Sequence, residues 1–113
     1  MEKLIDHVRE EFKLNKIIKN SQSTVREHLH VVWEQTGVKP DELNTPEPPE
    51  ELIYLVEYFN ELTLSRQYGN VANPISYSDI YAWSYLTKVS LTAWEVHVIK
   101  QIDMVYLNAQ SET

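Results

Sequence analysis

Apolar residues recur every three or four positions in five segments of the chain, with charged and polar residues between them. This spacing places the apolar side chains on one face of a helix, which is typical of an amphipathic helix packed on a core. The chain has two glycines and five prolines, fewer than the turns of a β-rich fold usually need. The pattern therefore predicts an all-α fold with helices at about 2–20, 24–36, 49–66, 77–87 and 93–109.

Residues 38–49 separate the first two predicted helices from the last three. They contain four of the five prolines, which disfavours a helix and predicts an extended connector with one turn near 41–43. Before the connector, Ser23 is a candidate N-cap and Gly37 a candidate left-handed C-terminal residue of the second helix. After it, Pro49 is suited to the first position of the third helix.

The last two predicted helices have the clearest start signals. Ser76 with Asp79, and Thr92 with Glu95, have the three-residue spacing in which a hydroxyl caps the helix and an acidic side chain answers it. Both pairs stand immediately before an apolar repeat. We therefore expect these four residues to have structural roles at helix starts.

Aromatic residues divide the chain unequally, since residues 48–113 contain ten of the twelve. Because aromatic side chains bury large areas, we expect the last three helices to form a small compact core. The N-terminal amphipathic helix, within residues 1–22, is then an arm or an addition to a domain at 23–113. Its single apolar stripe is where we expect self-association, should the chain form a homo-oligomer.

Charge limits the choice of partner. Ten Lys and Arg against 17 Asp and Glu give the 113-residue chain a net charge of −7. An acidic surface repels the phosphates of nucleic acids and anionic membranes, so we expect neither as a partner. No apolar run approaches the ~18 residues of a membrane span, and the first residues lack a secretory signal pattern. We expect a cytoplasmic location.

The sequence offers no recognisable catalytic or metal-binding motif. There is no cysteine, and the two glycines cannot build a phosphate-binding loop. His28 and His30 point in different directions on a helix, and Glu27 with His30 is a single copy of a spacing that di-iron sites use twice. We therefore expect no enzyme activity, no metal and no cofactor.

Tyrosines recur every fourth residue along the third and fourth predicted helices, beside the apolar stripes. One interpretation is packing at the edge of the core with the hydroxyl groups reaching water. The other is a protein-binding surface, because Tyr and Trp anchor interfaces. Our hypothesis for partner-binding residues names Tyr54, Tyr58, Tyr81, Trp83 and Tyr85.

Four segments in fixed order resemble the small tail assembly chaperones of long-tailed phages and prophages: VREHLHVVWEQTGVKPDEL, PPEELIYLVEYFNELTLSRQYG, NPISYSDIYAWSYLT and LTAWEVHVIKQIDMVYLNA. The resemblance covers about residues 24–109. Within it Trp94 and Asp103 belong to the shared pattern, and we expect structural roles for both. Arg66 is nearly the only cation among several acids there, and we expect it to tie helix ends together. Family members often have Trp and Gly where this chain has Tyr58 and Lys88.

The resemblance implies a non-enzymatic assembly factor. Such chaperones coat the long, helix-rich tape measure protein, are thought to recruit tail tube subunits, and are absent from the finished virion. Two alternatives stay open: a helical interaction adaptor of another phage or bacterial system, and a degenerate helix-turn-helix regulator. The regulator is disfavoured because its second helix would present Glu95, Asp103 and only Lys100 to DNA.

Overall fold

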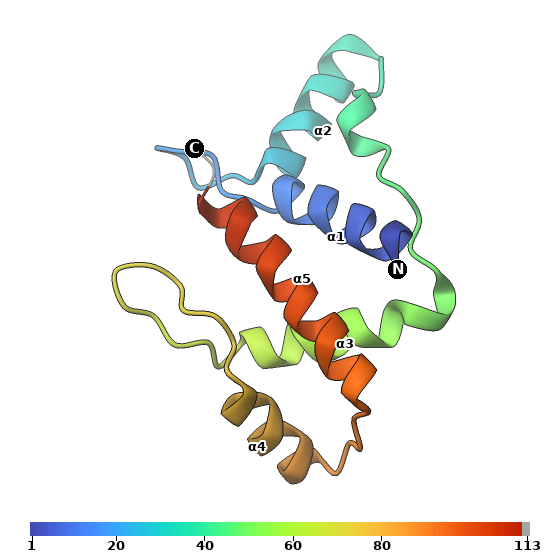
Figure 1. Ribbon diagram of the computed structural model, residues 1–113. Coiled ribbons are helices and arrows are strands. Elements are labelled where there is room, and N and C mark those ends of the chain that lie inside the picture. Colours follow the sequence, from blue (N-terminus) through green and yellow to red (C-terminus); the bar gives the residue numbers. More distant parts are fainter. Residues whose placement is uncertain (112–113) are drawn as a thin grey trace.

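The structure is a computed structural model, and it describes residues 1–111 of the chain. Within them the chain is all-helical and contains no strand, as the apolar pattern predicted (Figure 1). The elements are α1 (Glu2–Leu14), α2 (Val25–Thr36), the 3₁₀ helices η1 (Asp41–Leu43) and η2 (Glu50–Leu52), α3 (Ile53–Thr63), α4 (Tyr77–Thr87) and α5 (Ala93–Ser111).

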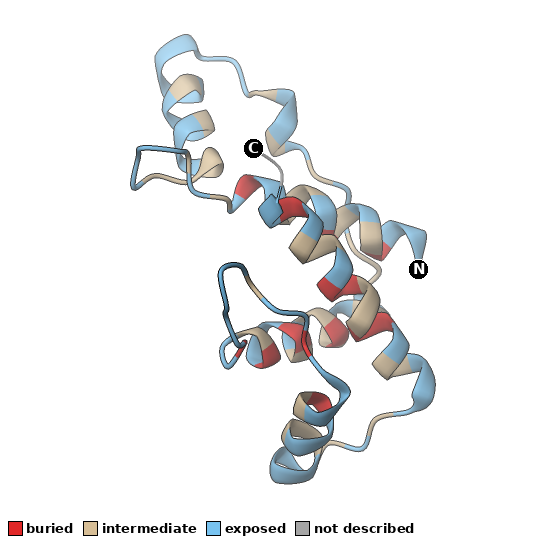
Figure 2. Ribbon diagram, turned by 60° about the vertical axis from the view of Figure 1, so that its left-hand side comes forward, coloured by how far each residue is buried: buried red, intermediate tan, exposed pale blue. Residues whose placement is uncertain are grey.

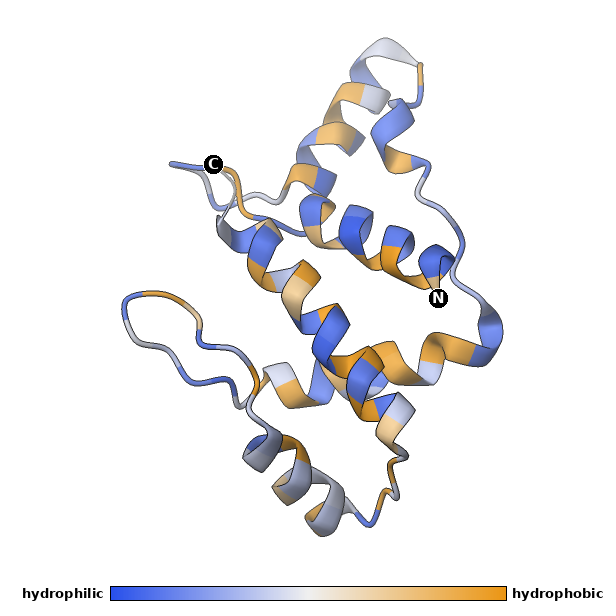
Figure 3. Ribbon diagram, viewed as in Figure 1, coloured by the Kyte–Doolittle hydropathy of each residue, from blue (hydrophilic) through white to orange (hydrophobic). Residues whose placement is uncertain are grey.

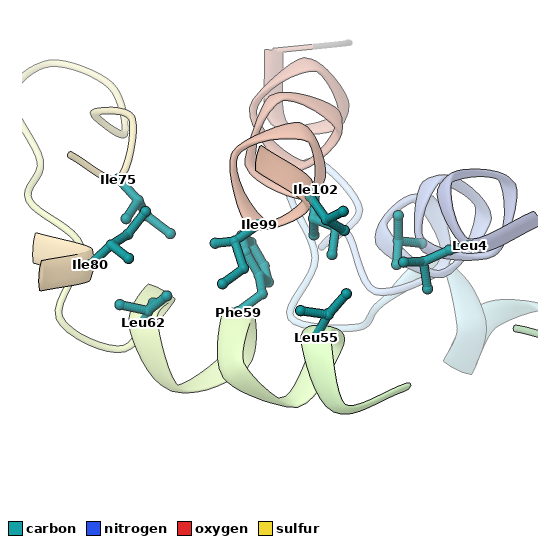
Figure 4. Packing of buried hydrophobic residues seen from close by; sticks show 10 residues of the cluster. Leu4, Leu55, Phe59, Leu62, Ile75, Ile80, Ile99 and Ile102 are labelled. Carbon is teal, nitrogen blue, oxygen red and sulfur yellow. The ribbon is translucent and has the colours of Figure 1, made fainter. Parts of the chain in front are cut away.

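Helix α5 is the central element, because α1 and α3 both pack against it (Figure 1). Figure 4 shows Ile99 and Ile102 of α5 pointing toward Phe59 and Leu55 of α3. Burying such aliphatic and aromatic side chains stabilises the fold by ~1.5–3 kcal/mol each. The buried core consists of Leu4, Val8, Leu55, Phe59, Leu62, Ile75, Ile80, Val98, Ile99 and Ile102.

The N-terminal helix is added to the C-terminal helices along α5. Leu4 and Val8, from the apolar stripe of α1, are completely buried in the shared core. This stripe is therefore covered within one chain, and the expectation that it mediates self-association is wrong. Helix α1 also ends at Leu14, earlier than predicted, because the backbone near Ile18 pairs with residues 23–25 instead of continuing the helix.

Helix α2 begins one residue later than expected. Thr24, and not Ser23, is its N-cap: the Glu27 backbone N–H donates to Thr24 Oγ1 at 3.1 Å, and the Glu27 side chain accepts from the Thr24 N–H at 3.1 Å. Gly37 ends the helix in the left-handed region at φ 73°, as predicted. No residue of α2 is fully buried, so the helix lies at the edge of the molecule (Figure 2).

The connector has the predicted turn at η1, but α3 is shorter than predicted at both ends. Pro49 precedes the 3₁₀ turn η2, and the α-helix begins only at Ile53. At the other end, the N–H groups of residues 64–66 bond to carbonyls three residues back, so the chain tightens after Thr63 before reaching Arg66.

Helices α4 and α5 start at the predicted caps. Ser76 Oγ accepts from the Asp79 N–H at 3.0 Å. Thr92 and Glu95 bond reciprocally, at 2.8 and 3.2 Å. Ile75 and Ile80, on either side of the first cap, lie next to each other in the core (Figure 4). These local contacts fix where α4 leaves the body of the molecule.

Candidate partner-binding surface

The structure places the five aromatic residues of the binding hypothesis on two separate surfaces. Residues two apart on a helix point ~200° away from each other, so Trp83 faces away from Tyr81 and Tyr85 on α4. Trp83 contacts Tyr58 of α3, whereas Tyr81 and Tyr85 contact each other. One predicted surface is therefore two, and the two differ in exposure.

The first surface, here called the aromatic cluster, consists of Tyr54, Tyr58 and Trp83. Its ring centroids lie 5.5 Å apart between the two tyrosines and 5.0 Å apart between Tyr58 and Trp83. All three side chains are half-buried and pack against the core. Because the cluster joins α3 to α4, its principal contacts are within the chain.

Tyr54 also connects the aromatic cluster to the start of α5. Its hydroxyl donates to Glu95 Oε2 at 2.7 Å, and this hydrogen bond, assisted by partial burial, raises the pKa of Tyr54. The pKa of Glu95 is lowered, chiefly by the hydrogen bond from the Thr92 backbone and then by that from Tyr54. One carboxylate thus caps α5 and holds the edge of the cluster.

The second surface, here called the tyrosine ridge, consists of Tyr77, Tyr81, Tyr85 and Leu86 on the outer side of α4. These side chains are 67–77% exposed. Tyr81 and Tyr85 stack with ring centroids 6.3 Å apart and an interplanar angle of 18°. None of the four carries a charge, so the ridge is an uncharged aromatic surface on a strongly acidic chain.

Two members of the tyrosine ridge were outside the binding hypothesis. Tyr77 continues the four-residue spacing of Tyr81 and Tyr85, a signal that was available in the sequence. Leu86 has the spacing of a core residue after Ile80 and Trp83, but it is solvent-exposed because no other helix lies opposite that part of α4. Its exposure depends on tertiary structure that the spacing does not contain.

Helix α4 presents most of its surface to solvent (Figure 2). Ile80 is its one buried residue, and the helix extends away from the body formed by α1, α3 and α5 (Figures 1 and 2). Figure 3 shows that after its first turn α4 lacks the strongly hydrophilic positions that alternate along α1. An exposed helix with so little charge is typical of an interaction surface.

A buried ion pair anchors the segment that leads into α4. Arg66 donates to Asp103 at 2.5 Å, and both side chains are almost completely buried. Arg66 also donates to the Asn73 carbonyl at 2.8 Å, and Asp103 accepts from the Ile75 N–H at 2.8 Å. The pair therefore joins α3, α5 and residues 73–75, and Arg66 is enclosed by these segments.

The remaining residues assigned structural roles lie apart from this network. Trp94 lies in the first turn of α5 and is 49% exposed.

An uncharged groove of about 510 Å³ lies between the 67–74 loop and the end of α5. Val71 and Leu107 are among the residues that line it.

Neither a metal-binding group nor a membrane-spanning helix is found among the described residues. Within residues 1–111, no three His, Asp or Glu side chains are grouped so that they could hold a metal ion. None of the helices in this range has the length and apolar composition of a membrane span.

The fold and these surfaces define a small helical protein with an exposed aromatic face. Residues 32–108 match the phage tail assembly chaperone family. Since this match covers more than half of the chain, the protein belongs to that family. The matched range contains both aromatic surfaces and the Arg66–Asp103 pair, and leaves out α1. No curated protein and no solved structure matches the chain.

Proposed function

We propose that this protein binds the tape measure protein during tail assembly and helps to recruit tail tube subunits, without catalysing a reaction. Family membership supports a role in tail assembly. The observation that carries the binding mode is the tyrosine ridge, a row of exposed aromatic side chains on a helix with little other packing. We place this activity in the host cytoplasm, before the virion is complete.

The ridge suits a helical partner on physical grounds. A long helical tape measure protein exposes apolar stripes before the tube encloses it, and such stripes aggregate unless they are covered. Tyr81 and Tyr85 have the most exposed aromatic surface to lose on docking, and they are the proposed anchors. Tyr54, Tyr58 and Trp83 hold α4 in place behind them. The net charge of −7 keeps the complex soluble.

Co-expression with the tape measure protein of the same phage or prophage tests this proposal. We expect the tape measure protein to become soluble and to co-purify with the wild-type chain. The double variant Tyr81→Ser/Tyr85→Ser should lose at least ten-fold in the amount recovered, because both anchors are removed while the fold does not use them.

A matched control removes two exposed apolar side chains elsewhere. Leu64→Ser/Val71→Ser changes residues that are 87% and 75% exposed but lie outside α4, and it should bind like the wild type. Equal recovery with the Tyr81/Tyr85 double variant would show that the ridge is not the binding surface. A tape measure protein that precipitates while the wild-type chain stays free would contradict the function itself.

A further inference from the structure

Positive charge is scarce in the C-terminal part of the chain and is concentrated beside the tyrosine ridge. Residues 48–113 contain three basic residues, Arg66, Lys88 and Lys100, against eight acidic ones. Arg66 is buried in its pair with Asp103 and is 1% exposed. The two remaining cations both border the ridge, one at each end of α4.

Lys100 lies at the N-terminal end of the ridge. Its Nζ is 4.8 Å from the centroid of the Tyr77 ring, where the ammonium group faces the negative side of the aromatic system. The same Nζ donates to the Ile75 carbonyl, so this lysine is held in place. It adds a fixed positive charge next to an exposed aromatic ring.

Lys88 lies at the C-terminal end, beside a hollow in the surface. The hollow has a volume of about 330 Å³ and is lined by Tyr81, Tyr85 and Lys88 together with Ser84, Val89 and Ser90. Lys88 supplies its one charge, and the lysine forms no ion pair within residues 1–111. The hollow therefore combines two aromatic walls with a free ammonium group.

We infer that the segment that docks on the tyrosine ridge is an amphipathic helix whose apolar stripe is edged by Asp or Glu, with one carboxylate in the hollow beside Lys88. The inference rests on the proposed function, in which the ridge receives a helical partner. The stripe covers Tyr77, Tyr81 and Tyr85, and the acidic edge meets the two lysines. The ridge spans ten residues of helix, or ~15 Å, which corresponds to about three turns of the partner.

This charge preference is opposite to the one that the whole chain predicts. A net charge of −7 attracts basic peptides at long range, but physiological salt screens exposed charges beyond ~8 Å. At contact distance Lys88 and Lys100 dominate. The acidic residue of α4 itself, Asp79, is half-buried in its first turn and lies two positions from Tyr81, away from the stacked tyrosines and on the side of Leu86.

Two designed peptides distinguish the local preference from the global one. Both are 18-residue helices with the same leucine stripe, one edged with Glu and the other with Lys at the same positions. Fluorescence anisotropy with the full-length protein at 150 mM NaCl measures their affinities. We expect the Glu-edged peptide to bind at least five-fold more tightly than the Lys-edged one.

Substitutions of Lys88 test whether this residue causes the preference for the Glu-edged peptide. Lys88→Asn keeps a residue that tolerates the left-handed backbone and should reduce the preference, since Lys100 remains, whereas Lys88→Glu should remove it. Lys19→Glu, an equal charge change at an exposed position far along the chain, should leave it unchanged. Circular dichroism on each variant verifies that helicity is retained.

Each outcome decides the inference. A wild-type preference for the Lys-edged peptide, equal binding, no binding of either peptide, or no effect of Lys88→Glu would overturn it. If the tape measure protein still co-purifies in that case, the proposed function stands and only the acidic edge is wrong. If co-purification fails as well, both are wrong.

Discussion

The aromatic cluster and the tyrosine ridge use the same residue types at the same spacing for different ends. Tyr54 and Tyr58 are four residues apart on α3, and Tyr81 and Tyr85 are four apart on α4. The first pair meets Trp83 and becomes an internal contact between helices, while the second has no helix opposite it and stays exposed. The spacing of the tyrosines is the same on both helices. Whether another helix lies opposite them decides whether they pack inside the protein or stay exposed to a partner.

The largest effect is expected from the ion pair on which both surfaces depend. Asp103→Ala leaves the Arg66 guanidinium buried without its partner and the Ile75 N–H without an acceptor. Removing one member of a buried pair typically costs ~3–5 kcal/mol, and we expect that loss in the free energy of unfolding. Urea denaturation followed by circular dichroism measures it. A loss below ~1 kcal/mol would contradict the structural role of the pair.

A charge swap refines this prediction. The double variant Arg66→Asp/Asp103→Arg restores opposite charges, but an arginine at position 103 cannot accept from the Ile75 N–H. We therefore expect only part of the stability to return. Complete recovery would mean that the bond to Ile75 contributes nothing.

The direct test of the comparison truncates one residue from each surface. Trp83→Ala should lower the free energy of unfolding by ~2 kcal/mol, less than for a fully buried tryptophan because Trp83 is half-buried. Tyr85→Ala should change it by less than ~0.5 kcal/mol, since Tyr85 is 73% exposed. Binding should show the reverse order when assayed by tape measure co-purification. Equal stability losses for the two variants would remove the distinction between the surfaces.

Local sequence signals predicted most of the fold. The cap at Ser76, the box at Thr92 and Glu95 and the left-handed Gly37 are short-range features, and the structure contains all of them. One error arose where a competing backbone pairing decides where a helix ends. Helix α1 stops at Leu14 because residues near Ile18 pair with residues 23–25, a competition that apolar spacing does not reveal.

The candidate site was less predictable than the fold. Its residue types could be read from the four-residue tyrosine spacing, but the division into two surfaces depends on how α4 is oriented against α3. The hollow beside Lys88 could not be predicted, because it forms only when the chain turns back after α4 and brings Val89 and Ser90 near Tyr81. Concave features of this kind arise from tertiary structure.

Substitution of Lys88 should change stability and peptide binding in opposite directions. It ends α4 in the left-handed conformation at φ 59°, which costs a residue with a side chain ~1 kcal/mol relative to glycine. Lys88→Gly should therefore raise the free energy of unfolding by ~0.5–1 kcal/mol while weakening binding of the Glu-edged peptide. Thermal unfolding and anisotropy on the same sample measure both effects. A variant that is less stable than the wild type would contradict the strained-cap account.

The smallest expected effect concerns the hydrogen bond between Tyr54 and Glu95 and its dependence on pH. Because the folded-state pKa of Glu95 is lowered, its contribution to stability is present above the ordinary carboxyl pKa and is lost as the pH falls through the folded value. Tyr54→Phe removes one cause of that lowering and keeps the other, the bond from the Thr92 backbone. We expect a loss below ~1 kcal/mol at neutral pH and a smaller decrease in stability on acidification than in the wild type.

Urea denaturation at pH 7 and pH 3 measures both quantities. Identical acid sensitivity of the two proteins would mean that the Tyr54 hydroxyl does not hold the Glu95 carboxylate. Tyr81→Phe, a change of the same size on the tyrosine ridge, provides the control, because the hydroxyl of that exposed side chain makes no hydrogen bond within residues 1–111 and its removal should leave the pH dependence as it is.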